Sequence, residues 1–152
     1  MTAVCGMDAA LGSCEHSVAQ QLSTMPTWLY VGGKPSKPIP ADPWKYPSSN
    51  MSYYTQPAKG AQLVDPSCSE MARFAARFVG WYTAGGFTDE CNTTHHSGLH
   101  YNWTFLSVLN EDEHHMVPSN QYTVCFDAWR QEVAKVNPRL TLIGPEGISS
   151  LG

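Results

Sequence analysis

Basic residues are scarce in this sequence and form no run. Nine lysines and arginines stand against thirteen aspartates and glutamates, which gives a net charge of −4 over 152 residues. Nucleic-acid surfaces need clustered basic side chains to contact phosphates, so we expect no nucleic-acid partner. No stretch has enough consecutive apolar residues to span a bilayer, so we expect no membrane partner either.

Several motifs that mark common enzymes and metal sites are absent. No Gly-rich fingerprint follows a predicted strand, which disfavours a dinucleotide or P-loop site, and the GxSxG elbow of serine hydrolases does not occur. The sequence contains no CxxC pair, and its histidine pairs at 95–96 and 114–115 match no standard zinc spacing. We therefore expect neither a metal nor a cofactor.

The cysteines and the Asn-x-Ser/Thr sequons bear on localisation. Five cysteines leave at least one free or paired outside the chain, and their spacing does not reveal the pairing. Sequons begin at Asn50, Asn92 and Asn102, although such tripeptides also arise by chance. Cysteines and sequons together favour a secreted or extracellular glycoprotein, while the sequence itself shows no signal peptide.

Length and composition fit one domain with a long internal loop. Hydrophobic residues make up 42% of the chain, which is enough for a core. Most of the prolines fall within residues 32–66, and this concentration predicts a long surface loop, which in a compact domain is often functional. A second loop, rich in histidine and other polar residues, is expected at 87–102.

Two amphipathic helices are predicted, at residues 67–84 and 118–136. Ser67 and Glu70 have the spacing of a capping box for the first helix, and Asp65 with the following proline offers an alternative cap. Apolar residues recur at helical period on one face of each helix and are predicted to face the core. They are Met71, Phe74, Ala75, Phe78, Trp81 and Tyr82 in the first helix, and Tyr122, Cys125, Phe126, Trp129, Val133 and Val136 in the second.

Short strands are predicted at residues 18–22, 103–109 and 140–143. Pro26 would interrupt a ladder, so an aromatic loop is expected after the first strand. Strands that alternate with helices pair in parallel through right-handed crossovers. The predicted fold class is therefore α/β, and the order of elements fits an incomplete (β/α)8 barrel.

The segment 105–111 carries the main functional signal. An apolar, partly β-branched run ends in Asn110 and Glu111, and a cluster of acids and histidines follows at once. A buried strand that presents a carboxylate at its C-terminal tip is the way in which parallel α/β folds build active sites. Glu111 is therefore predicted to be the residue that this strand positions.

Three segments, taken in order, resemble a known family: 23–29 (STMPTWL), 78–90 (FVGWYTAGGFTDE) and 108–111 (VLNE). They are similar to retaining glycoside hydrolases of the (β/α)8 superfamily that share an Asn-Glu pair at the end of barrel strand four. The resemblance is strongest to the β-xylosidase and α-iduronidase-like group, family 39, and covers about residues 16–147. It implies that the predicted strands are barrel strands three, four and five.

The resemblance also implies the chemistry. Glu111 would be the general acid/base, and Asn110 would hydrogen-bond the sugar 2-hydroxyl. The nucleophile would be a glutamate on barrel strand seven, which this sequence does not contain, because it covers strands three to five only. Family members have wider spacing after the catalytic glutamate than the spacing between Glu111 and the pair Glu113 and His114, and this sequence departs from the family pattern there.

Other candidate site residues each have a structural alternative. Trp28 is either a sugar-stacking platform or a half-buried loop anchor. His114 or His100 would line the sugar subsite, unless each is simply hydrogen-bonded within its loop. Glu146, after the last predicted strand, is the one candidate for a second carboxylate and is better suited to a substrate or structural contact.

Two other functions compete with an enzyme acting on carbohydrate. The chain is alternatively a truncated or degenerate barrel fragment that at most binds glycan, since the nucleophile is missing. The second alternative is a secreted carbohydrate-binding module that would use Trp28, Trp44 and residues 53–54. Such modules are mostly β-sandwiches, and the two predicted helices argue against one.

Overall fold

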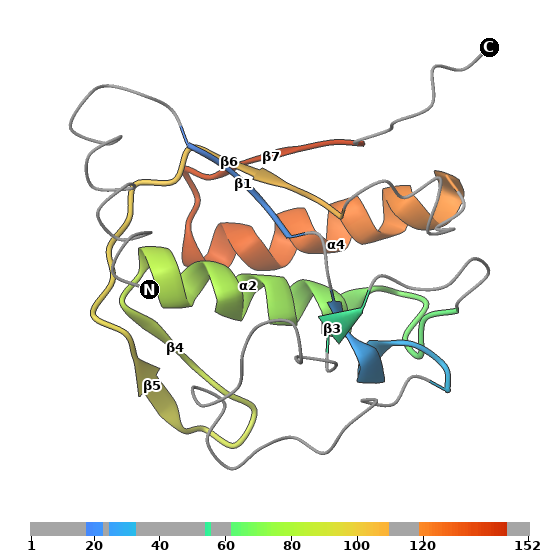
Figure 1. Ribbon diagram of the computed structural model, residues 1–152, viewed down its shortest axis with the longest axis horizontal. Coiled ribbons are helices and arrows are strands. Elements are labelled where there is room, and N and C mark those ends of the chain that lie inside the picture. The colour runs from blue at the N-terminus through green and yellow to red at the C-terminus, as the bar shows by residue number, and fades with distance from the viewer. Residues whose placement is uncertain (1–17, 23–24, 33–53, 56–61, 110–118, 146–152) are drawn as a thin grey trace.

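A computed structural model describes residues 18–22, 25–32, 54–55, 62–109 and 119–145. A small parallel sheet packs on a pair of helices, and short antiparallel strands lie on the opposite side of these helices (Figure 1). In chain order the elements are β1 (Ala19–Gln21), β2 (Met25–Pro26), η1 (Thr27–Leu29), β3 (Tyr54–Thr55), α2 (Ser69–Thr83), β4 (Gly86–Thr88), β5 (Thr94–His96), β6 (Phe105–Ser107), α4 (Ser119–Val136) and β7 (Thr141–Ile143).

The main sheet has the order β1-β6-β7, and both pairs of neighbours are parallel. Each strand falls within a predicted range, and α2 and α4 occupy the two crossovers. In the centre of the sheet, Leu106 is fully buried, in one cluster with Val79 of α2 and Trp129 of α4. The predicted mixed α/β class with parallel pairing is confirmed.

Both helices bury the faces that their periodicity predicts, with one exception. Along α2, Met71 and Ala75 are buried, and the aromatic residues Phe78 and Tyr82 pack half-buried against the core. Trp81 is the exception: its ring lies 6.2 Å from that of Phe87 in β4. The α2 face is wide enough to serve two layers, the core on one side and the β4–β5 hairpin on the other.

A disulfide between Cys68 and Cys125 joins the start of α2 to α4. Both residues are fully buried, and their Cα atoms lie 5.0 Å apart. Cys125 was predicted to face inward, and it does, as one half of this bridge. Among the described cysteines, Cys91 is free and exposed.

The start of α2 uses the alternative cap. One carboxylate oxygen of Asp65 accepts hydrogen bonds from the Ser67 N–H at 2.9 Å and the Ser67 hydroxyl at 2.6 Å. The other accepts from the Glu70 N–H at 3.0 Å. Asp65 thus satisfies the donors that the predicted Ser67–Glu70 box would have shared.

Two predicted loops contain strands: the proline-rich loop at 32–66 contains β3, and the loop at 87–102 contains most of β4 and all of β5. Pro26 does not end strand pairing, because β2 (Met25–Pro26) pairs with β3 (Tyr54–Thr55) and thus includes this proline. A two-residue ladder at an edge tolerates a residue that cannot donate a hydrogen bond. The segment 87–102, expected to be a loop, contributes most of the antiparallel hairpin β4–β5. Its polar threonines and histidines obscure the strand pattern in the sequence.

Candidate active site at the carboxyl edge of the sheet

The three parallel strands end at one level. Gln21, Ser107 and Ile143 are paired across the sheet, so the chain leaves all three strands at the same edge. Catalytic side chains of parallel α/β folds are drawn from the residues that follow such strand ends. We therefore expect the predicted site at the carboxyl edge of the sheet.

The ends of β6 and β7 are locked together by hydrogen bonds. The Val108 N–H donates to the Ile143 carbonyl oxygen at 3.1 Å. The Tyr122 hydroxyl of α4 donates to the Val108 carbonyl oxygen at 3.2 Å. A Cβ atom on Gly144 would lie 2.0 Å from that hydroxyl, so glycine lets β7 approach α4 closely. Two neighbouring strand ends are thus held in one fixed arrangement.

The last described residue after β6 has an unusual backbone. Leu109 is buried and has a positive φ of 62°, a conformation that costs a non-glycine residue energy and is concentrated at functional sites. The chain therefore turns sharply at the end of the central strand. In the sequence, Asn110 and Glu111 come directly after this turn.

Four of the predicted site residues, Asn110, Glu111, His114 and Glu146, lie outside the described residues. What the structure brings together are the strand ends that precede them in sequence. Leu109 and Pro145 are the described residues before Glu111 and Glu146, and they follow adjacent strands.

His100 is in the wrong place to line a subsite at this edge. It lines a cavity of about 340 Å³ with residues that precede β6 and β7, among them Trp103 and Arg139. Those residues lie at the amino edge of the sheet, opposite the carboxyl ends. The imidazole of His100 packs against Gly85, where a Cβ atom would lie 2.7 Å away. This place does not favour a role for His100 in a subsite at the carboxyl edge, and a hydrogen bond of His100 within its loop stays a prediction.

Trp28 belongs to a separate cavity beside α2. This residue lies in η1, and 51% of its surface is exposed. The cavity is about 290 Å³ and is lined by Trp28, Leu29, Glu70, Arg73, Phe74, Arg77 and Glu90. The strand-end residues Leu22, Leu109 and Gly144 do not line it.

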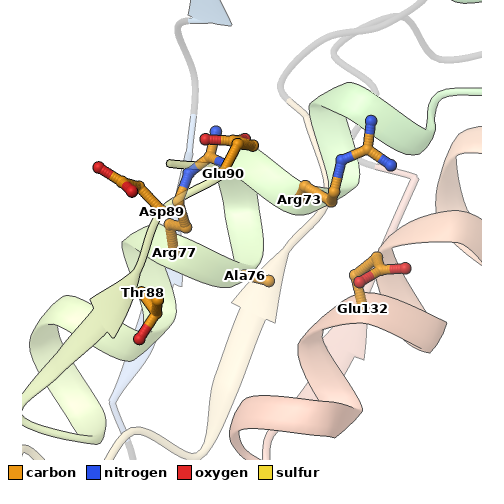
Figure 2. Close-up of a pocket in the computed structure, with 7 residues that line it drawn as sticks. All are labelled: Arg73, Ala76, Arg77, Thr88, Asp89, Glu90 and Glu132. Atoms are coloured by element: carbon orange, nitrogen blue, oxygen red, sulfur yellow. The ribbon is translucent and has the colours of Figure 1, made fainter. Parts of the chain in front are cut away.

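A second cavity of about 300 Å³ adjoins the first, since both are lined by Arg73, Arg77 and Glu90. Its other lining side chains come from α2, the β4–β5 hairpin and Glu132 of α4 (Figure 2). The two arginines lie one turn apart on the polar side of α2. Sequence reasoning missed them because a polar helix face reads as solvated surface unless its neighbours are known.

Ion pairs organise most of the charges around these cavities. The Arg77 guanidinium donates to the Glu90 carboxylate, and Lys135 donates to Glu132 at 2.6 Å. The pKa of Glu90 is lowered by a hydrogen bond from its own backbone N–H and by that from Arg77. Arg73 has no such partner among the described residues.

The hairpin turn that follows β4 is held by one carboxylate. One oxygen of Asp89 accepts from the Cys91 and Thr93 N–H groups at 2.9 and 2.8 Å. The other lies 2.8 Å from Nε2 of His95. The pKa of Asp89 is lowered, chiefly by the hydrogen bond from His95 and then by that from Thr93. These bonds account for both side chains as parts of the turn.

Comparison with protein-family models, with curated proteins and with solved structures finds no match. None of the helices in the described part of the chain has the length and apolar character needed to cross a bilayer.

Proposed function

We propose that this chain supplies the general acid/base, Glu111, of a retaining glycoside hydrolase. The observation that carries the proposal is the position of β6. It is the central strand of a parallel sheet, and its chain turns at Leu109 immediately before Asn110 and Glu111 in sequence. A catalytic carboxyl group after a central parallel strand fits the way in which (β/α)8 enzymes are built.

The proposed architecture is a slice of a (β/α)8 barrel. Successive strands β1, β6 and β7 are neighbours, as barrel strands three, four and five would be. In such a barrel the helices cover the outer face of the sheet, and α2 and α4 cover one face here. A barrel of about 250 residues would provide the remaining strands.

The proposed mechanism divides the work between two carboxyl groups about 5–5.5 Å apart. Glu111 donates its proton to the leaving oxygen as the glycosidic C–O bond breaks, and later takes a proton from the attacking water. Asn110 holds the sugar 2-hydroxyl. The nucleophile is expected on a later strand, and Glu146 is the weaker candidate within the chain.

Because the proposal expects the nucleophile on a later strand, external azide can take the place of the nucleophile in a direct experiment. Azide added to the wild-type chain should attack the anomeric carbon of phenyl β-xyloside from the vacant side, forming a C–N bond as phenol leaves with the proton of Glu111. The expected product is α-xylosyl azide. In Glu111→Gln the azide-dependent release of phenol should fall at least about 100-fold, while Glu113→Gln, a matched neighbouring acid, should stay within a few-fold of wild type.

Three other results would change or contradict the proposal. Equal azide-dependent rates in Glu111→Gln and wild type would remove Glu111 from the mechanism. Release of phenol without azide would show that this chain completes the reaction with an in-chain nucleophile or with water, and Glu146→Gln would then test the in-chain carboxylate. No release from any aryl glycoside would contradict the proposal and favour the alternative, a non-catalytic barrel fragment that at most binds glycan.

The proposed partner is a glycan and the proposed location is extracellular. The buried Cys68–Cys125 disulfide supports the location, because structural disulfides persist in oxidising compartments. Of the three sequons, those at Asn92 and Asn102 fall on exposed residues, which fits a glycoprotein.

A further inference from the structure

We propose that the cavity beside α2 is a second sugar-binding site, formed by Trp28, Arg73 and Glu70 and separate from the carboxyl edge. It takes one uncharged pyranose ring of a glycan. The inference rests on the proposed function only in assuming that the protein meets a glycan. It does not require that the chain hydrolyse one.

The cavity is small and has an aromatic wall, Trp28. The cavity of about 290 Å³ is at the lower end of small-molecule sites, about 300 Å³, so it suits one ring rather than a chain of sugars. Trp28 lies beside the cavity with about half of its surface exposed. A ligand that covered this ring would bury a large apolar area. An exposed indole wall is suited to stacking against the apolar face of a pyranose.

Two charged side chains of α2, Glu70 and Arg73, line the cavity beside the indole ring. Neither Glu70 nor Arg73 pairs with another described side chain. They stand three positions apart on α2, so their side chains emerge from the same side of the helix. The Arg73 guanidinium supplies hydrogen-bond donors and the Glu70 carboxylate supplies acceptors. Neighbouring sugar hydroxyls can use both.

The balance of charge selects an uncharged ligand. Glu70 and Glu90 oppose Arg73 and Arg77 around the cavity, so its lining has no net charge. Because Arg77 already forms an ion pair with Glu90, an anion could pair only with the Arg73 guanidinium. The same anion would be repelled by the Glu70 carboxylate. A polyol uses donors and acceptors alike and meets no repulsion.

The adjoining cavity gives the glycan a direction. It continues past Arg73 over Ala76 toward Glu132 of α4 (Figure 2). Ala76 forms a low floor between the charged side chains on either side. A second sugar of the same chain would follow this path, whose sides again carry both donors and acceptors.

The test follows the indole N–H signal of Trp28 in two-dimensional NMR, with Trp28→Phe to assign it. The probes are xylohexaose, cellohexaose and mannohexaose, added to the Glu111→Gln chain so that no probe is cleaved. At least one should shift the Trp28 signal saturably while the signals of the buried Trp103 and Trp129 stay in place. In Arg73→Ala the dissociation constant should rise at least about tenfold.

Arg139→Ala is the matched control, because Arg139 is also exposed and lines a different cavity; binding should be unchanged. Failure of all three probes to shift Trp28 would overturn the inference, as would equal binding by Arg73→Ala. Tighter binding of glucuronate or sulfate would show an anion site instead. Trp28 binding in a chain without azide-dependent activity would keep this inference and reject only the proposed function.

Discussion

Asp65 illustrates how much of a helix start depends on one side chain. Its carboxylate accepts three hydrogen bonds, two from Ser67 and one from the Glu70 N–H. These bonds, with that from the Ser67 hydroxyl as the largest cause, lower the pKa of Asp65 below its ordinary value of 3.8. The charged form is therefore favoured in the folded protein.

We predict that Asp65→Ala lowers the free energy of unfolding by about 1 kcal/mol at neutral pH. A lowered folded pKa means that the stabilisation is present above the unfolded pKa near 3.8 and is lost as the pH falls through the folded value. Urea unfolding at pH 7 and at pH 3 measures both effects. Asp127→Ala, an exposed acid paired loosely with Arg130 at 3.9 Å, is the control; an equal loss there would refute the capping role.

Gly144 and Tyr122 should show coupled effects. Gly144→Ala adds a Cβ atom 2.0 Å from the Tyr122 hydroxyl at a φ of +150°, and we expect it to cost at least about 2 kcal/mol. Tyr122→Phe alone should cost about 1 kcal/mol through its lost hydrogen bond to Val108. Because the phenylalanine lacks the clashing oxygen, the double variant should cost less than the sum.

Gly98→Ala separates backbone strain from the clash. Gly98 also has a positive φ, of 68°, but no atom lies within 4 Å of its added Cβ. Its substitution should cost only about 1 kcal/mol. Additive losses in the Gly144 and Tyr122 cycle, measured by urea unfolding, would count against the close packing of β7 on α4.

Some of these residue roles can be read from sequence and others cannot. Asp65 was one of two caps that local spacing allowed, since both lie within a turn of the same helix. The need for glycine at 144 depends on Tyr122, which is 22 positions away (144 − 122) and comes from another element. Contacts between distant residues leave no local pattern.

The disulfide joins α2 to α4, and we predict that it contributes much of their mutual stability. Its cysteines are 57 positions apart, a loop for which the chain-entropy model gives about 4 kcal/mol. Replacing both Cys68 and Cys125 by alanine should lower the free energy of unfolding by this order. Cys91→Ala, at the exposed free cysteine, should change it little. Equal stability with and without reductant would contradict the prediction.

The long helices were predictable from the sequence, and the shortest strands were not. Helices α2 and α4 each repeat apolar residues over several turns, so their existence and inner faces follow from the sequence. Strands β2 and β3 have two residues each, too few for any alternation. In the β4–β5 hairpin, Gly86 and Phe87 pair with His96 and His95, and Thr88 pairs with Thr94. The hairpin is stabilised by packing on α2, where Phe87 lies beside Trp81.

The sheet has a second face that the two helices do not cover. On that face, Ala19, Gln21 and Thr141 are exposed and Phe105 and Ile143 are half-buried, while Ser107, between Gln21 and Ile143, is buried. Parallel sheets are normally covered on both faces. Among the strands that the structure describes, none pairs with the outer edge of β7, and unpaired edges promote association.

We therefore predict that the isolated chain self-associates. Light scattering coupled to size exclusion should show a mass well above 16.7 kDa that rises with protein concentration. Ile143→Lys should reduce the association, because Ile143 is half-buried on the sheet face that α2 and α4 do not cover. A monodisperse monomer with a cooperative thermal transition would contradict the view that this sheet belongs to a larger barrel.

The role of Glu111 is most directly tested by varying the leaving group. Azide-dependent release from phenyl and dinitrophenyl β-xylosides should be compared in wild type and Glu111→Gln. Phenol needs a proton as it leaves and dinitrophenol does not, so kcat/KM should fall at least about 100-fold for the first and less than about tenfold for the second. Equal losses for both substrates, or no loss for either, would mean that Glu111 is not the general acid.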